Sequence, residues 1–188
     1  MAKRVCPFWV GYLLISPLRT LMQNPEKILS RYITPGMKVL DIGCGMGFFS
    51  LPIARMVGSK GKVICIDVQD KMIKSLQKRA KKAGLTDIIE TRICHQNSLS
   101  LDDLNEEIDF ALAFAIVHEV PNVTQFFSEI HKALKPTGML LVAEPKGHVS
   151  EKDFEITISI AQHNRFKAIS HPQIWRSRTI LLARSSAI

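Results

Sequence analysis

A glycine-rich turn follows the first regular apolar run of the chain and limits the folds that the sequence can adopt. In the stretch KVLDIGCGMGFFSLP, residues 38–52, the glycines Gly43, Gly45 and Gly47 occupy alternate positions directly after this run. Glycines in a turn from a strand into a helix let backbone amides approach a ligand without interference from a Cβ atom. The turn therefore predicts a ligand site at the carboxyl end of a strand.

Strand-like and helix-like segments alternate from residue 37 onward. Strands are expected in MKVLDIG, KVICIDV, IIETRIC, IDFALAFAI and GMLLVAEP, and helices in FFSLPIARMV, DKMIKSLQKRAKKAG, VTQFFSEIHKAL and DFEITISIAQHN. Gly84 is expected to close the second of these helices and Asn122 to cap the third. The pieces FKAISHP and RTILLAR predict a terminal hairpin. This alternation indicates an α/β fold with a doubly wound, mostly parallel sheet.

The length and composition fit one domain over residues 1–188. The chain has 188 residues, 46% of them hydrophobic, and a chain of this size buries roughly 70% of its unfolded surface. We expect residues 33–188 to form the core and residues 1–32 an apolar, helical segment. A helix is expected over residues 24–33, across this boundary, with Asn24 as its cap. The apolar run VCPFWVGYLLISPL is interrupted by prolines and too short to span a bilayer, so we interpret it as a possible lid.

The cysteines and the charge narrow the class of protein. Cys6, Cys44, Cys65 and Cys94 form no C-x-x-C pair, which argues against a disulfide framework or a metal site and favours reduced thiols in the cytoplasm. The net charge of +8 is densest in residues 71–82, where apolar residues recur at helical spacing opposite the lysines. We interpret this segment as a solvated helix face, with a nucleic-acid partner as the alternative.

An acidic residue, Asp41, precedes the first glycine of the turn. The glycines follow a G-x-G-x-G spacing, whereas dinucleotide-binding enzymes use G-x-G-x-x-G. A carboxylate here repels a pyrophosphate but attracts the cationic sulfonium and amino groups of S-adenosylmethionine. Asp67 ends the next strand, where a carboxylate can accept both ribose hydroxyls. The charge pattern therefore favours S-adenosylmethionine over NAD.

Four motifs in order carry a resemblance to a known family. VLDIGCGMG and VICIDV resemble the first two signature motifs of class I S-adenosylmethionine-dependent methyltransferases. IDFALAFAIVHEVPN resembles the family's fourth strand, and LKPTGMLLVAEP resembles the LKPGGxLLxxEP strand of the ubiquinone/menaquinone branch. The resemblance runs from about Met37 to Arg184 and implies a Rossmann-like sheet of seven strands, in the order 3-2-1-4-5-7-6, whose last strand is antiparallel.

The resemblance also implies which residues bind the cofactor. Asn97 stands where the family usually has an aspartate that contacts the adenine amino group, and an amide oxygen can accept the same hydrogen bond; an Asx turn is the alternative. Phe114 is expected to flank the adenine, unless it is a core residue, and Cys44 to contribute its backbone rather than a thiolate. The full set expected to bind the cofactor is Asp41, Gly43, Cys44, Gly45, Gly47, Phe48, Asp67, Val68, Met72, Asn97, Ser98 and Phe114.

The candidates for the acceptor side follow the fourth and fifth strands. His118 and Glu144 stand just after or at the ends of these strands, and His118 would be a general base if the nucleophile carries a proton. An ordinary loop histidine is the alternative. Glu119 and Tyr12 are further candidates for substrate contact. No metal ligand is expected, and the histidines expected on the surface without neighbouring functional groups are His131, His148, His163 and His171.

A methyl group on a sulfonium is already activated, so catalysis needs mainly correct positioning of the nucleophile. Short loops after the strands favour a small-molecule acceptor. One alternative is a nucleic-acid or protein methyltransferase that uses the positive charge, and another is a cofactor-binding or scaffold protein without catalysis. The accepting atom and the oligomeric state stay open.

Overall fold

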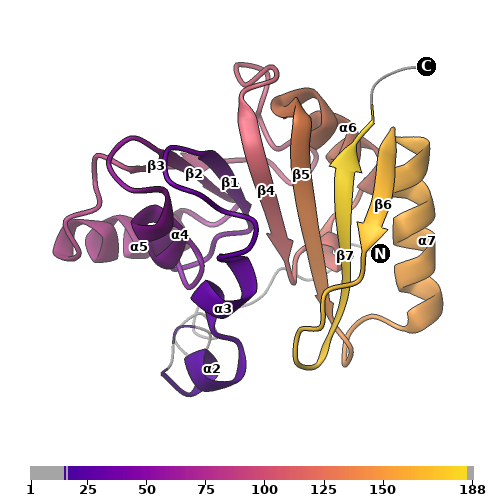
Figure 1. Ribbon diagram of the computed structural model, residues 1–188, viewed down its shortest axis with the longest axis horizontal. Helices are drawn as coiled ribbons and strands as arrows, with labels where there is room; N and C mark the ends of the chain where they lie inside the picture. Colours follow the sequence, from indigo (N-terminus) through magenta and orange to yellow (C-terminus); the bar gives the residue numbers. More distant parts are fainter. Residues whose placement is uncertain (1–14, 16, 186–188) are drawn as a thin grey trace. The chain divides into compact units, whose positions relative to one another are not determined.

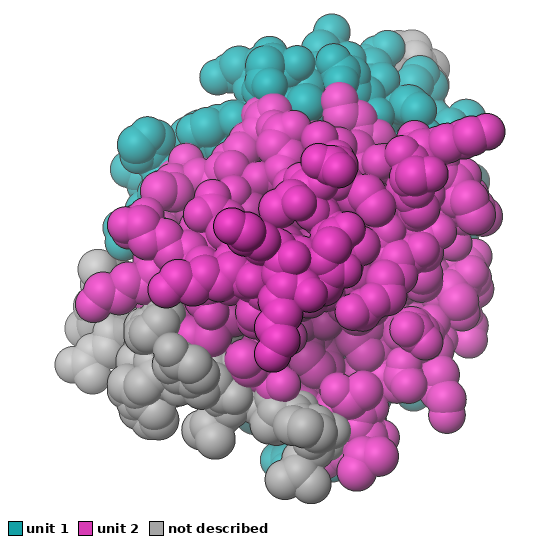
Figure 2. Space-filling view, turned by 90° about the vertical axis from the view of Figure 1, so that its left-hand side faces the viewer, with its two compact units in different colours: residues 1–4, 95–188 teal, residues 5–94 magenta. Residues whose placement is uncertain are grey.

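The computed structural model describes residue 15 and residues 17–185 of the chain. The described residues divide into two compact units, which we name the amino-terminal unit (residues 15–94) and the carboxyl-terminal unit (residues 95–185) (Figure 2). Tyr12 and most of the expected lid lie outside the described residues. The expectation of one domain over residues 1–188 stays a prediction.

The amino-terminal unit contains three parallel strands with helices between them (Figure 1). β2 pairs with β1 on one side and with β3 on the other, so that Cys65 stands beside both Asp41 and Thr91. The elements are α2 (Pro17–Met22), α3 (Pro25–Leu29), β1 (Lys38–Ile42), α4 (Ser50–Val57), β2 (Lys62–Asp67), α5 (Asp70–Lys82) and β3 (Ile89–Ile93).

Helix α3 begins where the sequence predicts and ends earlier. The Asn24 side chain accepts hydrogen bonds from the amides of Glu26 and Lys27, at 2.9 and 3.1 Å, and Pro25 occupies the first helical position. The helix ends at Leu29 rather than near Ile33, because a turn over residues 30–32 leads into the Thr34–Pro35 step, and a residue before proline disfavours the helical conformation.

Helix α5 confirms the predicted solvated face. Its apolar residues Met72, Ile73, Leu76 and Ala80 are buried. Its lysines, at positions 71, 74, 78, 81 and 82, are exposed. Gly84, with φ +68°, follows the helix end as predicted.

The carboxyl-terminal unit contains four strands. β4 and β5 are parallel, β5 and β7 are antiparallel, and β7 and β6 form the predicted terminal hairpin, with a register shift between Ala168 and Ser170. Asn122 caps α6 by accepting from the Gln125 amide at 3.0 Å, as predicted. The elements are β4 (Ile108–Phe114), η1 (Val117–Glu119), α6 (Val123–Ala133), β5 (Leu134–Pro145), α7 (Glu151–His163), β6 (Phe166–Ser170) and β7 (Ser177–Arg184).

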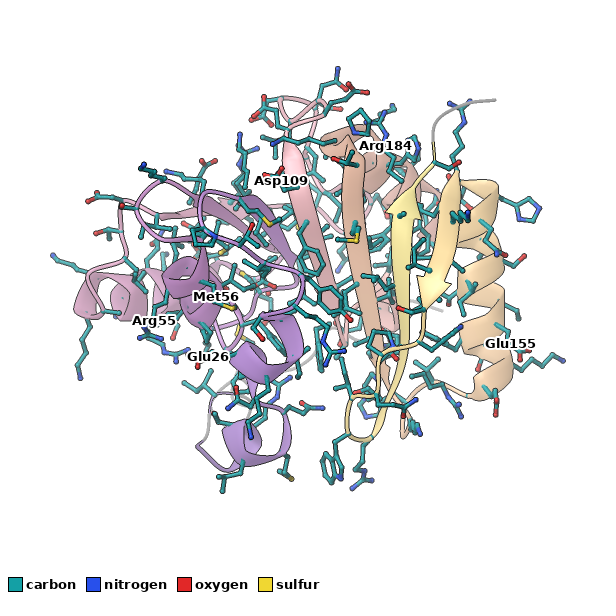
Figure 3. The ribbon with its side chains drawn as sticks, viewed as in Figure 1. Glu26, Arg55, Met56, Asp109, Glu155 and Arg184 are labelled. Atoms are coloured by element: carbon teal, nitrogen blue, oxygen red, sulfur yellow. The ribbon has the colours of Figure 1, made fainter. Side chains whose placement is uncertain are left out.

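The strand order confirms the fold class. The described strands form one mixed sheet in the order β3-β2-β1-β4-β5-β7-β6, with β7 antiparallel to its neighbours. The strand interiors are apolar, as the fully buried Leu40, Ile64, Phe110 and Leu141 show, whereas side chains such as Glu26, Arg55 and Glu155 are exposed (Figure 3). Among the helices of the described residues, none combines the length and the apolar character that crossing a membrane requires.

Candidate cofactor and acceptor sites

The turn after β1 is tied to the end of β2. The amides of Gly43 and Cys44 donate to the Ile66 carbonyl at 2.9 and 3.1 Å, and the Gly45 amide donates to Asp67 Oδ2 at 2.9 Å. Gly43, Gly45 and Gly47 have φ values of +68°, +54° and +85°, which L-residues with a side chain rarely adopt. The amides expected to face a ligand therefore donate within the protein, and the glycines are needed for the path of the turn.

A Cβ atom would meet different surroundings at two glycines of the turn. A Cβ atom on Gly47 would lie 2.4 Å from Leu76 Cδ1 and 2.6 Å from Leu51 Cδ1, so core side chains occupy its place. No atom of the residues that the structure describes would lie within 4 Å of a Cβ atom on Gly45. Open space thus adjoins the turn at Gly45, whose amide is bound to Asp67.

Asp67 ends β2 with a carboxylate that is 8% exposed. Oδ2 accepts the Gly45 amide and Oδ1 accepts the Gln69 amide at 2.8 Å. Burial raises the pKa of this carboxyl group, and the hydrogen bonds from the backbone counteract the rise. Two carboxylate oxygens have about four lone-pair directions, so Asp67 retains capacity to accept ribose hydroxyls.

Asp41 lies at the end of β1 and is 3% exposed. Its Oδ2 accepts a hydrogen bond from Ser50 Oγ at 2.5 Å. Burial raises the pKa of Asp41 to about 6, and Ser50 and Arg19 counteract this rise. Ser50 begins α4 and was not predicted from the sequence, because a serine after two phenylalanines gives no sign of which strand residue it contacts.

Arg19 of α2 is a second residue that the sequence analysis missed. Its Cζ lies 4.1 Å from the centroid of the Phe48 ring and 5.7 Å from that of Phe49. Burial lowers the pKa of Arg19 to about 10, and the charge of Asp41 counteracts this fall. The available signal was an arginine within the apolar stretch ISPLRTLM.

The other predicted cofactor residues of the amino-terminal unit are mostly buried. Burial, followed by the neighbouring Cys65, raises the pKa of the Cys44 thiol well above its usual value, which agrees with a backbone role for this residue. Met72 is 3% exposed and belongs to the core face of α5. Val68 is half-buried and directs its amide toward the Asp67 carboxylate.

Glu144 and His118 form one hydrogen-bonded group in the carboxyl-terminal unit. The Glu144 carboxylate is 1% exposed and accepts from the amides of Ile116, Val117 and His118 at 3.0, 2.9 and 3.3 Å. It also contacts His118 Nδ1. An ionised carboxylate can only accept, so Nδ1 carries a proton. Glu144 therefore orients the imidazole and caps η1.

The surroundings of His118 differ in one respect from the sequence analysis. The His118 side chain is 23% exposed, and Nε2 lies 3.9 Å from Glu119 Oε1. The His148 ring packs edge-on against the His118 ring with the centroids 5.5 Å apart. The expectation that His148 has no neighbouring functional group was wrong, because the turn after β5 brings it back toward η1.

His131 is likewise not a simple surface residue. It is half-buried, its Nε2 lies 3.2 Å from the Ser185 carbonyl oxygen, and its ring packs against Phe166. Burial lowers the pKa of His131. His163 and His171 are exposed, as predicted.

The turn that contains Asn97 and Ser98 is held by Glu129 of α6. Ser98 Oγ donates to Glu129 Oε2 at 3.3 Å, and the Leu99 amide donates to the same oxygen at 2.7 Å. Asn97 is exposed in this turn, and Phe114 is half-buried at the end of β4. Among the residues that the structure describes, no group of three or more His, Cys, Asp or Glu side chains could hold a metal ion.

Comparisons with known proteins agree with this fold. The family model described as a methyltransferase domain matches residues 33–179. A structure of an S-adenosylmethionine-dependent methyltransferase from Aquifex aeolicus is similar, with a TM-score of 0.84 and 24% identity over 95% of this chain and 98% of that one. Geranyl diphosphate C-methyltransferase from Streptomyces coelicolor gives a TM-score of 0.68 and 14% identity over 86% of this chain and 79% of that one.

Curated relatives are similar over part of their length. Demethylmenaquinone methyltransferase of Geobacillus stearothermophilus is 26% identical over 69% of this chain and 54% of its own length. A ubiquinone/menaquinone biosynthesis C-methyltransferase of a Shewanella species is 28% identical over 65% of this chain and 49% of its own. The chain spans about half the length of these relatives.

The sheet order and the turn after β1 define a protein with the Rossmann-like fold of class I S-adenosylmethionine-dependent methyltransferases. The chain belongs to the methyltransferase domain family. The predicted class of enzyme, with S-adenosylmethionine as its cofactor, is thus confirmed at the level of the family and the fold.

Proposed function

We propose that the protein transfers a methyl group from S-adenosylmethionine to a small-molecule acceptor. The observation that carries this proposal is the pair of buried carboxylates, Asp41 and Asp67, at the ends of two neighbouring strands, with open space beside Gly45. Ribose hydroxyls suit Asp67, and a cationic amino group suits Asp41. The two carboxylates therefore fit this cofactor in charge and as hydrogen-bond acceptors.

Two residues of the chain would bind different parts of the cofactor. Asp67 would hold the ribose and Asp41 the amino group of the methionine moiety. When bound, the cofactor supplies a methyl group already activated by the positive sulfur. The burial of Asp41 strengthens its interaction with the cationic amino group, because little water competes for the carboxylate.

His118 is the proposed base on the acceptor side. Glu144 holds the proton on Nδ1, so the neutral imidazole carries its lone pair on Nε2, and 23% of the side chain is exposed. His118 would take the proton of a hydroxyl or another protonated nucleophile. Glu144 acts through His118 as a positioning residue.

An aromatic hydroquinone is the proposed kind of acceptor. The names of two relatives refer to demethylmenaquinone and to ubiquinone and menaquinone, whose reduced rings carry hydroxyl groups that a base can deprotonate. The resulting phenolate makes a ring carbon nucleophilic; that carbon would take the methyl group and then lose its own proton, which restores the aromatic ring. The exposed lysines of α5 keep a nucleic-acid acceptor as a second candidate. We further expect the protein to act in the cytoplasm.

The test uses S-adenosylmethionine with a labelled methyl group and a fractionated extract of the native cell. Label in a solvent-extractable small molecule, and in a reduced naphthoquinone that lacks its ring methyl, is the expected result. Label in RNA or protein that falls steeply with salt would overturn the choice of acceptor. Binding without transfer to any fraction would show a cofactor-binding protein instead.

A further inference from the structure

Arg19 of α2 is half-buried and places its guanidinium against the turn that follows β1. The guanidinium stacks on Phe48, with Cζ 4.1 Å from the ring centroid, and Nε donates to Gln23 Oε1 at 3.1 Å. Partial burial lowers the pKa of Arg19 to about 10.

Arg19 and Asp41 act on each other electrostatically. The charge of Asp41 raises the pKa of Arg19, and the charge of Arg19 lowers the pKa of Asp41. Of the apolar side chains of α2 that the structure describes, Leu21 and Met22 are 84% and 47% exposed, so their packing does not account for the position of Arg19. The contacts place both groups at one segment, because Arg19 lies over the rings of Phe48 and Phe49 and Asp41 accepts a hydrogen bond from the next residue, Ser50.

We propose that Arg19 binds the α-carboxylate of the methionine moiety of S-adenosylmethionine, while Asp41 binds its amino group. Such a pair of opposite charges matches the zwitterion of an α-amino acid, and the fork of a guanidinium fits a carboxylate with two parallel hydrogen bonds. The inference rests on the proposed function and adds a third group to its cofactor site. It makes Arg19 a residue that selects for the intact amino-acid end of the cofactor.

A competing role makes the opposite prediction. If Arg19 only neutralises Asp41, it competes with every cationic ligand for that carboxylate. Its removal would then strengthen the binding of S-adenosylmethionine. If Arg19 binds the carboxylate, its removal weakens the binding of ligands that have a carboxylate and not of those that lack one.

The experiment compares S-adenosylmethionine with its decarboxylated form by calorimetry. The two ligands share the adenosyl, sulfonium and amino groups and differ in the carboxylate. Wild type should prefer the intact cofactor by about 10- to 100-fold, the scale of a hydrogen bond to a charged group. Arg19→Met should reduce this preference to less than about threefold, and the methionine keeps an apolar contact with Phe48.

Two further variants serve as controls. Arg31, whose Cζ lies 5.9 Å from the Tyr32 ring, is exposed, so Arg31→Met should leave both affinities unchanged. Asp41→Asn should weaken the binding of both ligands by the same factor, because both ligands carry the amino group.

Each outcome decides between the roles. A preference for the intact cofactor that survives in Arg19→Met, or stronger binding of both ligands by this variant, would overturn the carboxylate assignment. An equal loss of both ligands would show that Arg19 supports the turn as a whole. Absence of binding of either ligand to wild type would contradict the proposed function itself, and it would be recognised before any variant is measured.

Discussion

The Gly45 amide donates a hydrogen bond of 2.9 Å to the carboxylate of Asp67, which lies 22 residues further along the chain. This bond joins the turn after β1 to the end of β2, and the open space beside Gly45 adjoins it. The same carboxylate that would bind the ribose thus also shapes the turn.

Alanine substitutions at Gly47 and Gly45 should affect different properties: the first the stability of the fold, the second mainly the binding of the cofactor. Gly47→Ala places a Cβ atom 2.4 Å from Leu76 Cδ1 at φ +85°, so we expect a loss of about 2 to 4 kcal/mol in the free energy of unfolding. Gly45→Ala meets open space at φ +54°, so it should cost about 1 kcal/mol but block the cofactor. Urea unfolding and calorimetry measure both, and normal cofactor affinity in Gly45→Ala would contradict the location of the site.

Removal of the Asp67 carboxylate should weaken the binding of every ligand that contains the ribose. We expect Asp67→Ala to lose about 1.5 to 3 kcal/mol in the binding of S-adenosylhomocysteine, the scale of a hydrogen bond to a charged group. The binding of methylthioadenosine, which lacks the amino-acid end, should be weakened by the same amount. A folded variant that binds both ligands like wild type would refute the ribose assignment.

Asp41 should make the folded protein less stable as the pH rises. Its pKa is about 6 in the folded state against an ordinary value of 3.8, so the folded state holds the proton more tightly than the unfolded state does. The contribution of Asp41 to the free energy of unfolding is therefore highest below about pH 4. It falls by at most about 3 kcal/mol as the pH rises toward 6.

Asp41→Asn tests this pH dependence, because asparagine keeps an oxygen acceptor for Ser50. At about pH 8 the variant should be more stable than wild type by up to about 3 kcal/mol, and at about pH 4 the two should be similar. Cofactor binding to wild type should weaken as the pH falls below about 6. Equal stability of wild type and variant across this pH range would show that the buried charge of Asp41 does not destabilise the folded protein.

Substitutions at Glu144 and His118 should have different effects: a change at Glu144 should lower the stability of the fold, and a change at His118 should lower turnover. Glu144→Gln offers a single acceptor oxygen to the amides of residues 116–118, so it should lose about 2 to 3 kcal/mol of stability. His118→Asn keeps an N–H donor for Glu144 and should stay folded, with turnover lowered about 100-fold or more and its pH dependence lost. Cofactor affinity should not change, and normal turnover in this variant would leave His118 as structure.

The sequence predicts the elements well, because their signals are local. Asn24 and Asn122 cap helices where the pattern places them, and the apolar period of α5 defines its buried face. β5 begins at Leu134, before the predicted start at Gly138, because its first residue pairs with Ile108 ahead of the register shift. Pairing between distant segments decided this boundary.

The candidate site is less predictable, since its contacts join distant positions. Glu144 was recognised as a polar residue at a strand end, but its partners are amides 26 to 28 residues earlier. No local pattern shows where the amides of a turn will point. The same reason explains why the contacts of Arg19 with Phe48 and of Ser50 with Asp41 were missed.

The register shift in the terminal hairpin also affects how the protein behaves at high concentration. In the described sheet, β6 and β3 are the outermost strands. β6 combines the shift with an exposed Lys167, and β3 carries an ion pair of 2.7 Å between Arg92 and Glu90. Interrupted and charged edges are poor templates for a strand from another molecule, so edge-to-edge aggregation of this sheet is disfavoured.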